Sequence, residues 1–446
     1  MNTWTPSSWK SKPIRQWAEY PDPKALDDEV AFVSSLPPLV TSGEIEELHS
    51  HLRGAEDGHY FILQGGDCSE TFESCRPDII TSKIKIMLLM SYILIYGMDK
   101  RIVRIGRIAG QYAKPRSEST ETRGGITLPS YRGPMINRPE FTLEARTPDP
   151  INLRRAYSHA AMTLNFMRSV IDGGLGDMHH PEYWELGFIN LAEQSKEYRQ
   201  IVQSIDSSVR FMEVIAGRID ELTHMKLFCS HEGLHLPYEM AHTRQVPRRS
   251  GYYNLTTHMP WIGDRTRGLD GAHVEYFRGI ANPIGMKVGP SMMPDELVEL
   301  TKVLNPNNMK GRLCLIHRFG AKKIGDCLPP LAEAIREAKR NVLWISDPMH
   351  GNTQTTDDGI KTRSFDDILS ELCQSFAILE REGTHLGGIH VELTGENVTE
   401  CIGGARGLTP EDLHRDYQSD VDPRLNYEQA IEMALLIATR QASRRR

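Results

Sequence analysis

The sequence predicts an α/β protein, a (β/α)8 TIM barrel with an N-terminal extension and extra helices inserted after strand 2. Three observations predict this fold. Short apolar runs end in polar or glycine-rich turns, helical stretches separate most of them, and the strand–helix unit recurs eight times. No G-x-G-x-x-G opens a helix after a strand, which disfavours the competing doubly wound sheet that binds dinucleotides.

The first 55 residues are predicted to form an irregular arm. Trp4, Trp9 and Trp17 stand among prolines, which disfavours long helices before about Lys24. Because tryptophan is costly to leave in water, we expect the arm to pack on the barrel or on a neighbouring subunit. Residues 56–446 are expected to form one barrel domain, although 446 residues alone favour about three domains.

The predicted strands are 59–64, 101–108, 226–230, 253–262, 284–288, 312–316, 341–345 and 388–391. The predicted helices are 78–96, 151–172, 233–244, 270–281, 294–304, 329–340, 364–381 and 427–442. The chain between strands two and three is too long for one crossover. Apolar residues there predict two further helices within 181–217, so we expect a helical insertion at about 175–220.

Composition excludes several classes of protein. The chain has 52 Lys and Arg against 59 Asp and Glu, a net charge of −7 without the basic footprint of a nucleic-acid binder. The longest apolar run, 84–96, is interrupted by Lys85 and is too short to span a bilayer. Seven scattered cysteines without C-x-x-C pairs argue against a disulfide scaffold. We expect a cytoplasmic protein with no membrane or nucleic-acid partner.

Residues able to bind a metal follow three strands that would be neighbours in a closed barrel. Cys68, His350 and Glu392 follow strands one, seven and eight, and Asp420 or Asp422 could supply a fourth ligand. Singly, such a cysteine or histidine is more often a core or hydrogen-bonded residue. Their shared position at the catalytic face favours a divalent transition ion such as Mn, Fe, Co or Zn.

Four cations end strands two, four, five and six: Arg107, Arg265, Lys287 and Arg318. Such groups recognise phosphate and carboxylate, and equivalent positions in one barrel mouth favour a small polyanionic ligand. Ordinary ion pairs with nearby acids are the alternative. A second basic patch, Lys114-Pro115-Arg116-Ser117, follows strand two and could hold a second phosphate.

Longer motifs follow most of the predicted strands: 63–68 (LQGGDC), 107–117 (RIAGQYAKPRS), 261–263 (WIG), 287–290 (KVGP), 347–353 (DPMHGNT), 388–398 (GIHVELTGENV) and 422–426 (DPRLN). Together they resemble one known family, the class II (plant-type) 3-deoxy-D-arabino-heptulosonate 7-phosphate (DAHP) synthases. The resemblance runs from about Trp9 to Ile437. It implies a transferase, 3-deoxy-7-phosphoheptulonate synthase. This enzyme condenses phosphoenolpyruvate with erythrose 4-phosphate and water to DAHP and phosphate, the first step of the shikimate pathway of aromatic amino acid biosynthesis.

The resemblance also implies roles for individual residues. The metal ligands would be Cys68, His350, Glu392 and Asp422, with Mn²⁺ expected and Co²⁺, Fe²⁺ or Zn²⁺ as alternatives. Phosphoenolpyruvate would be bound by Arg107, Arg265, Lys287 and Arg318, with Asp264 beside them. The phosphate of erythrose 4-phosphate would be bound by Lys114, Arg116 and Ser117. Lys287 or Glu232 would handle the proton of the attacking water.

The chain departs from the family pattern at three places. Asp264 stands where a glutamate is usual, Pro134 where an aspartate is common, and Ser419-Asp420-Val421 lacks a cysteine of some members. Rival hypotheses are an amino-DAHP synthase of a secondary-metabolite pathway, a non-catalytic regulatory homologue, and an unrelated phosphate-binding barrel. A regulatory homologue predicts a missing metal ligand, and none is missing. The family also implies a homo-oligomer, a dimer or tetramer, with aromatic amino acids as effectors.

Overall fold

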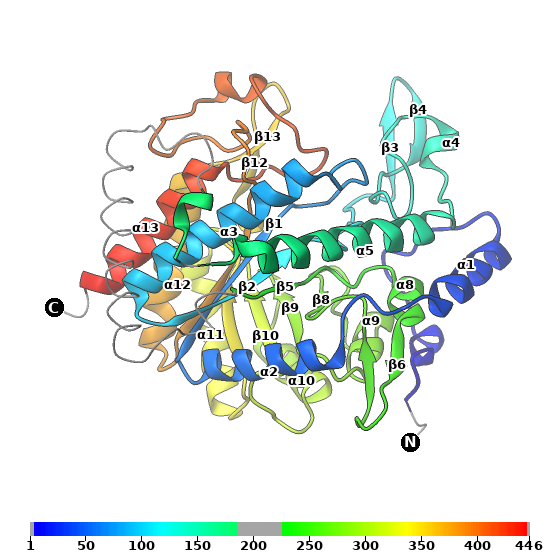
Figure 1. Ribbon diagram of the computed structural model, residues 1–446, viewed down its shortest axis with the longest axis horizontal. Coiled ribbons are helices and arrows are strands. Elements are labelled where there is room, and N and C mark those ends of the chain that lie inside the picture. Colours follow the sequence, from blue (N-terminus) through cyan, green and yellow to red (C-terminus); the bar gives the residue numbers. More distant parts are fainter. Residues whose placement is uncertain (1–3, 178, 185–224, 444–446) are drawn as a thin grey trace.

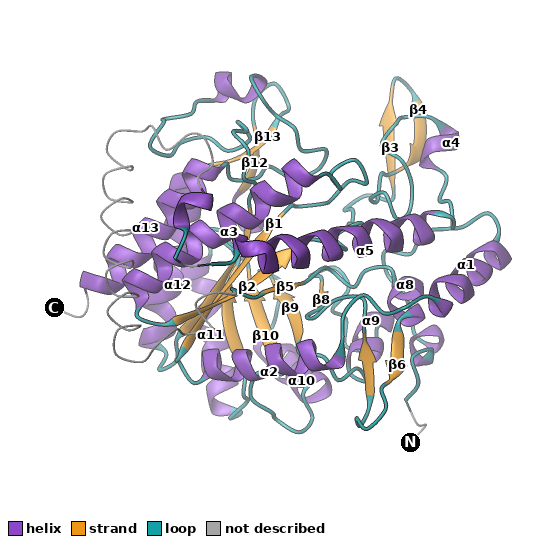
Figure 2. Ribbon diagram, viewed as in Figure 1, coloured by secondary structure: helices purple, strands orange, loops and turns teal. Residues whose placement is uncertain are grey.

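A computed structural model describes residues 4–177, 179–184 and 225–443, and its centre is a curled, eight-stranded parallel sheet (Figures 1 and 2). In spatial order the strands are β5 (Leu227–Cys229), β2 (Arg101–Arg107), β1 (Tyr60–Gly66), β14 (Leu386–Glu392), β11 (Leu343–Ser346), β10 (Leu313–His317), β9 (Ile284–Val288) and β8 (Trp261–Ile262). The expectation of eight parallel strands is confirmed. An isolated parallel bridge between Glu232 and Trp261 links the segment after β5 to β8.

The fourth predicted strand, 253–262, is wrong over most of its length. Its start, β7 (Tyr252–Asn254), pairs antiparallel with β6 (Thr243–Gln245), and only β8 at its end joins the main sheet. The amide of Asn254 donates to the side chain of Asn282, and its carbonyl accepts from that side chain. A side-chain bridge therefore takes backbone groups that a continuous strand would pair with its neighbours.

Two further hairpins and the helices complete the described fold. The hairpins are β3 (Thr120–Arg123) with β4 (Ile126–Pro129), and β12 (Thr353–Thr355) with β13 (Lys361–Arg363). The helices are α1 (Pro23–Ser35), α2 (Ser42–Glu56), α3 (Pro77–Met98), α4 (Leu143–Arg146), α5 (Asn152–Val170), α8 (Leu236–Ala241), α9 (Ala272–Phe277), α10 (Pro294–Leu304), α11 (Ile324–Glu337), α12 (Phe365–Arg381) and α13 (Tyr427–Ser443). The prediction for α10 is confirmed at both ends, whereas α8 and α9 are shorter than predicted. Of the two helices predicted within 181–217, all but a short 3₁₀ turn at Pro181–Trp184 lies outside the described residues.

The prediction of an irregular arm over residues 1–55 is wrong beyond Asp22, because α1 and α2 follow. Asp22 caps α1 by accepting from the amides of Lys24 and Ala25. Thr41 and Glu44 form a reciprocal capping box at the start of α2. Both start signals stand in the sequence, so the helices were predictable from local chemistry.

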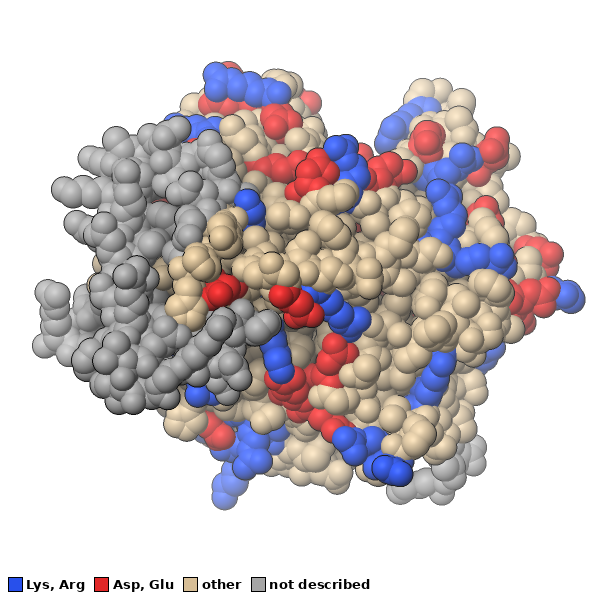
Figure 3. Space-filling model, viewed as in Figure 1, with Lys and Arg blue, Asp and Glu red and all other residues tan. Residues whose placement is uncertain are grey.

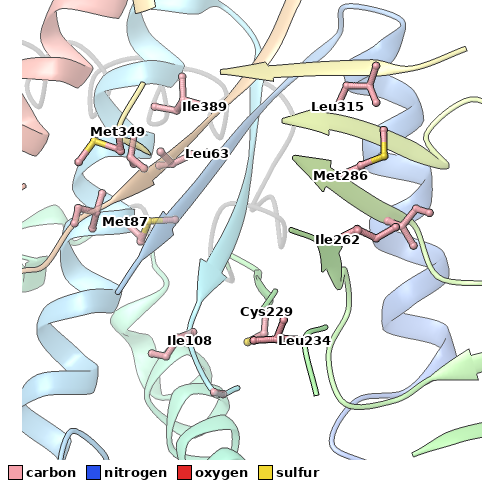
Figure 4. Close-up of a cluster of buried hydrophobic side chains, with 14 of the residues drawn as sticks. Leu63, Met87, Ile108, Cys229, Leu234, Ile262, Met286, Leu315, Met349 and Ile389 are labelled. Atoms are coloured by element: carbon pink, nitrogen blue, oxygen red, sulfur yellow. The ribbon is translucent and has the colours of Figure 1, made fainter. Parts of the chain in front are cut away.

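Alternating strand residues form two clusters on opposite faces of the sheet. In β1, Ile62 belongs to one cluster and its neighbours Phe61 and Leu63 to the other. Leu48 and Leu52 of α2 pack in one cluster with Ile62 and with residues of other strands. Part of the other cluster is shown in Figure 4, with Leu63 of β1 and Ile389 of β14 on the side of Met87 of α3, and Ile262, Met286 and Leu315 of β8, β9 and β10 on the opposite side. The sheet is thus buried on both faces.

Helix α3 is long and apolar enough to cross a membrane by length and composition, although 67% of that apolar window is buried inside the protein. It packs against α13 and contacts β1, β2 and α5. Buried contacts on this scale are typical of a core helix in a soluble fold.

Three contacts hold the N-terminal segment to the body of the molecule. The indole of Trp4 donates to the carbonyl of Glu275 at 2.8 Å, and the amide of Ala272 donates to the carbonyl of Pro13 at 2.9 Å. Tyr20 shares a 2.8 Å hydrogen bond with His235 Nε2. The segment therefore lies along α8 and α9, as Figure 1 shows on its right-hand side. On the face in Figure 3, charged side chains of both signs are interspersed, so its described part carries no patch of a single sign.

Candidate active site

The register of three strands brings their carboxyl ends level. Gly66 at the end of β1 pairs with Glu392 of β14 on one side and with Arg107 of β2 on the other. Gly66 has φ 142°, and a Cβ there would lie 2.7 Å from the carbonyl oxygen of Arg107. Glycine is therefore required for this close approach of two strands, which sets Arg107 and Glu392 beside one cavity.

The cavity has a volume of about 460 Å³ and lies at the carboxyl ends of the sheet strands. Every site residue predicted from the sequence lines it: Cys68, Arg107, Lys114, Arg116, Ser117, Glu232, Asp264, Arg265, Lys287, Arg318, His350, Glu392 and Asp422. Residues more than 350 positions apart in the chain, such as Cys68 and Asp422, thus line the same cavity. Asp420, the alternative fourth metal ligand, is not among the lining residues and faces a neighbouring hollow of about 230 Å³.

Three of the four predicted metal ligands form one group. The ligand atoms of Cys68, Glu392 and Asp422 all lie within 4.8 Å of one another. His350 stands at the edge of this group, with its Nε2 3.0 Å from Glu392 Oε1. The convergence follows from pairing between distant segments: β14 pairs with β1, and Leu425, three residues after Asp422, forms a parallel bridge with Leu393, directly after β14.

The chemistry of this donor set fits a divalent cation. A thiol, an imidazole and two carboxylates suit a transition ion. The ammonium of Lys114 lies against Cys68 Sγ and Asp422 Oδ2, so the group already attracts a positive charge. Burial raises the pKa of the Cys68 thiol, as does the neighbouring Glu392. A bound divalent ion would reverse this effect, because a coordinating thiol loses its proton.

Asp347 and Arg363 orient two of the predicted metal ligands, His350 and Glu392. Asp347 Oδ2 lies 2.7 Å from His350 Nδ1, which leaves Nε2 facing Glu392, as in carboxylate–histidine–metal triads. Arg363, fully buried, donates to Glu392 Oε2 at 2.8 Å. Burial of Glu392 raises its pKa, but His350, Arg363 and Arg107 outweigh this and hold the pKa well below its usual range. The Glu392 carboxylate therefore stays ionised in a buried site.

Arg107 is almost completely used by protein partners. Its guanidinium donates to the carbonyls of Asp67 and Cys68, to Glu392 at 2.9 Å and to His390 Nε2 at 2.6 Å. It is 2% exposed, although it still lines the cavity. Arg107 therefore fixes the backbone at Cys68 and the carboxylate of Glu392.

Of the remaining strand-end cations, two pair with carboxylates. Lys287 pairs with Asp347, and Arg318 donates to Asp264 at 3.2 Å. Arg265 is exposed and donates to the hydroxyl of Ser117 at 2.9 Å. Ion pairing, the alternative weighed above, thus accounts for part of the positive charge. The argument for a polyanionic ligand rests instead on the shared cavity that these cations line.

Lys287 lies in the floor of the cavity. Burial lowers its pKa to about 8, while Asp347 opposes this shift and Arg107 adds to it. Its Nζ lies 6.0 Å from the centroid of the Trp261 ring. A lysine with this pKa changes its charge near neutral pH, which suits both anion binding and proton transfer.

Glu232 is the other candidate for proton transfer. Its Oε1 is buried without a hydrogen-bond partner, and burial raises its pKa against the opposing effect of Lys287 and Arg265. A Cβ at Gly263 would lie 2.0 Å from this oxygen, so the carboxyl reaches the site only because residue 263 is a glycine. An unpartnered carboxyl with a raised pKa is able to exchange a proton at the cavity wall.

The sequence analysis did not single out several residues that line the cavity or contact the predicted ligands: Asp347, Arg363, Lys361, Trp261 and Gln111. Asp347 precedes His350 by three positions, and Lys361 Nζ lies 3.3 Å from Asp422 Oδ1. The spacing of Asp347 and His350 is a signal that could have been used. Arg363 and Lys361 come from the β12–β13 hairpin, and nothing in their local sequence points to the cavity.

Comparisons with known proteins agree with this site. A family profile described as the class-II DAHP synthetase family matches residues 4–438. A protein from Neurospora crassa named phospho-2-dehydro-3-deoxyheptonate aldolase is 47% identical over 98% of this chain and 94% of its own length. A protein of the same name from Streptomyces coelicolor is 44% identical over 97% of this chain and 96% of its own length. A protein from Mycolicibacterium smegmatis named phospho-2-dehydro-3-deoxyheptonate aldolase AroG is 41% identical over 96% of this chain and 92% of its own length.

The family resemblance carried by the motifs is thereby confirmed over nearly the whole chain. The match covers more than nine-tenths of this chain and of each relative, so it is not confined to the central sheet or to the site. The chain belongs to the class-II DAHP synthetase family.

Proposed function

We propose that the chain condenses phosphoenolpyruvate with erythrose 4-phosphate and water to give DAHP and inorganic phosphate. It would thereby open the shikimate pathway. The observation that carries this proposal is one cavity lined by a thiol, an imidazole and two carboxylates on one side and by four strand-end cations on the other. Membership of the family supplies the reaction, and the cavity supplies groups that match both substrates.

Cys68, His350, Glu392 and Asp422 would hold one divalent ion, with Mn²⁺ as the first expectation. When bound, the ion supplies Lewis acidity toward the carbonyl oxygen of the aldehyde. Asp347 keeps the imidazole of His350 in the tautomer that leaves Nε2 free. Arg107 and Arg363 keep Glu392 ionised and fixed in place.

Phosphoenolpyruvate would lie over Lys287, between Arg265 and Arg318, with Asp264 holding Arg318. Most donors of Arg107 already bind protein groups, so Arg107 would contribute its positive charge to the cavity rather than direct hydrogen bonds to the substrate. These cations neutralise the phosphate and carboxylate, which would otherwise repel the second anionic substrate. C3 of the enol then attacks the aldehyde carbon, water adds at C2, and phosphate leaves.

The phosphate of erythrose 4-phosphate would lie against Lys114, Arg116 and Ser117. Ser117 is bridged to Arg265 at 2.9 Å, which supports adjoining sites for the two anions. Lys114 contacts the metal-ligand group in this structure, so its ammonium would turn toward the substrate when a metal ion replaces it. Glu232 or Lys287 would handle the proton of the attacking water.

The wider architecture is proposed on the same basis. The bridge between Glu232 and Trp261 supports a closed (β/α)8 barrel, and residues 1–55 form an arm on the single domain 56–446. The helical insertion at about 175–220 and the arm would join subunits into a homo-oligomer and bind aromatic amino acid effectors. A cytoplasmic location is expected for such an enzyme.

The direct test is phosphate release by the purified chain with both substrates and Mn²⁺, before and after chelation. We expect turnover that chelation abolishes and Mn²⁺ restores. Replacing Cys68 removes one metal ligand, so Cys68→Ala should lower metal affinity on the order of 10-fold to 100-fold, measured by titration calorimetry. Cys373→Ala, a half-buried cysteine on α12 away from the cavity, is the matched control. No turnover with any divalent metal would refute the proposed activity, and full metal affinity in Cys68→Ala would refute the ligand assignment.

A further inference from the structure

The side chain of Gln16 connects the N-terminal segment to the wall of the cavity. Its Nε2 donates to the carbonyl of Arg116 at 3.0 Å, and its Oε1 accepts from the amide of Arg116 at 2.9 Å. One amide group thus binds both peptide groups of a single residue, as a neighbouring strand would. Arg116 lies in the 114–117 loop, 100 positions away.

A third hydrogen bond fixes the orientation of this amide. Arg132 NH1 donates to Gln16 Oε1 at 3.1 Å, so this atom accepts from two donors and its partner Nε2 remains the donor. Arg132 also holds the loop itself, because its carbonyl accepts from the amide of Lys114 at 2.9 Å. Gln16 and Arg132 therefore hold the loop at two points, two residues apart.

The backbone at Gln16 is held in an uncommon conformation. Its φ is 63°, in the left-handed region that residues other than glycine rarely adopt. The chain is fixed on both sides of Gln16. On one side the amide of Ala272 donates a hydrogen bond to the carbonyl of Pro13, and on the other the ring of Trp17 stacks on that of His235, with ring centroids 6.4 Å apart. Such strain persists where surrounding contacts determine it, and here it aims the side chain at the loop.

The loop that Gln16 holds faces the cavity at each of its polar residues. Ser117 accepts from Arg265, Arg116 pairs with Glu121 at 3.1 Å, and all of these residues line the cavity. A loop released at Arg116 would shift the donors of Arg116 and Ser117 together. A displacement of about 1 Å in such positioning groups is enough to weaken binding or catalysis strongly.

We propose that Gln16 is a positioning residue for the second substrate: it holds the 114–117 loop where its side chains bind the phosphate of the aldose phosphate. This inference rests on the proposed function, and it makes the N-terminal segment part of the binding site. Gln16 does not line the cavity, so it acts through Arg116 rather than by touching substrate.

The test compares substitutions that change either the length of the Gln16 side chain or its hydrogen-bond donor. Gln16→Asn tolerates a positive φ but is one methylene too short to span both peptide groups. We expect it to raise the KM for erythrose 4-phosphate on the order of 10-fold, with the KM for phosphoenolpyruvate within about 2-fold of wild type. Gln16→Glu keeps the acceptor and loses the donor. Its KM for erythrose 4-phosphate should therefore lie between those of the wild-type chain and Gln16→Asn.

Tyr157→Phe is the matched control, because Tyr157 makes another hydrogen bond to the N-terminal segment, to the carbonyl of Pro37 at 3.0 Å, away from the cavity. It should leave both KM values unchanged. Thermal unfolding midpoints of all variants report whether each still folds. Unchanged kinetics in Gln16→Asn, or an equal rise of both KM values, would overturn the inference.

Binding of inorganic phosphate gives a second readout that needs no turnover. Calorimetric titration with inorganic phosphate is run at saturating phosphoenolpyruvate, so that Arg265, Lys287 and Arg318 are already occupied. Gln16→Asn should then bind phosphate about 10-fold more weakly than the wild-type chain. If the wild-type chain binds phosphate but releases none from the two substrates, the proposed reaction fails while this comparison still decides the role of Gln16. Equal phosphate affinity in the two chains would again overturn it.

Discussion

At Lys287, burial and ion pairing act in opposite directions. Burial lowers the pKa to about 8 although Asp347 lies against the ammonium. The folded pKa is thus below the ordinary value of 10.5, so the unfolded chain binds more protons between these two values. The stability cost of burying the charged ammonium is fully present below about pH 8, and stability rises as pH increases from 8 toward 10.5.

This pKa predicts how substrate binding depends on pH. Loss of the Lys287 charge above about pH 8 should raise the KM for phosphoenolpyruvate, because a neutral amine no longer offsets the anion. Lys287→Arg stays charged and should move the rise to higher pH. Steady-state kinetics from pH 6.5 to 9.5 measure both profiles. A KM that is flat across this range in the wild-type chain would contradict the prediction.

Most site residues that follow a predicted strand were identified from the sequence, whereas several elsewhere in the chain were missed. Cys68 and Glu392 follow apolar runs directly, and both line the cavity. Arg363 and Asp347 are fully buried charges, and their role depends on which carboxylate or imidazole they meet. These contacts form only when the chain folds, and they cannot be read from the sequence alone.

Among the elements, helix α12 has a role beyond covering the sheet. Its buried Glu371 accepts from the amide of Phe319 at 2.8 Å and from Asn352 Nδ2 at 2.7 Å. These partners stand next to Arg318 and two residues after His350. One carboxylate therefore ties together the loops after β10 and β11, and its burial raises its pKa to about 7.

Glu371→Leu should destabilise the fold by roughly 1–3 kcal/mol, because it removes the acceptor of the buried Phe319 amide and one of the acceptors of the Asn352 side chain. Glu371→Gln keeps one acceptor and should lose less. Both should lower kcat/KM by displacing Arg318 and His350. Urea unfolding and steady-state kinetics measure these effects. Ser370→Ala, an exposed change on the same helix, is the control, expected within about 0.5 kcal/mol of wild type. A stability loss no larger in Glu371→Leu than in this control would refute the role of the carboxylate.

Element boundaries show where periodicity suffices. Helix α10 begins at Pro294 and ends at Leu304 as predicted, because its apolar spacing and start signal agree. The fourth strand was overextended, because an apolar run does not reveal that Asn282 will take the backbone groups of Asn254. A side chain 28 residues away decided that element.

Across the whole molecule, the cavity joins elements from both ends of the chain. Gln16 near the start, Cys68 after β1 and Asp422 before α13 all bear on one site, so the site exists only when the entire sheet has formed. Ligand binding should therefore stabilise global folding rather than one region.

Phosphoenolpyruvate at 100 times its dissociation constant should raise the free energy of unfolding by about 2.7 kcal/mol. Thermal or urea unfolding with and without the ligand measures this gain. Arg318→Met should reduce the gain, because it removes a cation that lines the cavity. Lys302→Met, an exposed lysine on α10 outside the cavity, should not. An unfolding midpoint that does not move with phosphoenolpyruvate would contradict the placement of this substrate.

The sequence by itself determined the α/β class, seven of the eight strand positions, the family and the set of polar residues at the strand ends. These follow from local periodicity, turn chemistry and long motifs. The tertiary structure shows Asp422, and not Asp420, beside Cys68 and Glu392, in agreement with the family resemblance, and it shows Asp347 and Arg363 in contact with the predicted ligands His350 and Glu392. It also decided that Gln16 reaches the 114–117 loop. Each of these depends on the distance between residues far apart in the chain, which packing sets and local sequence does not encode.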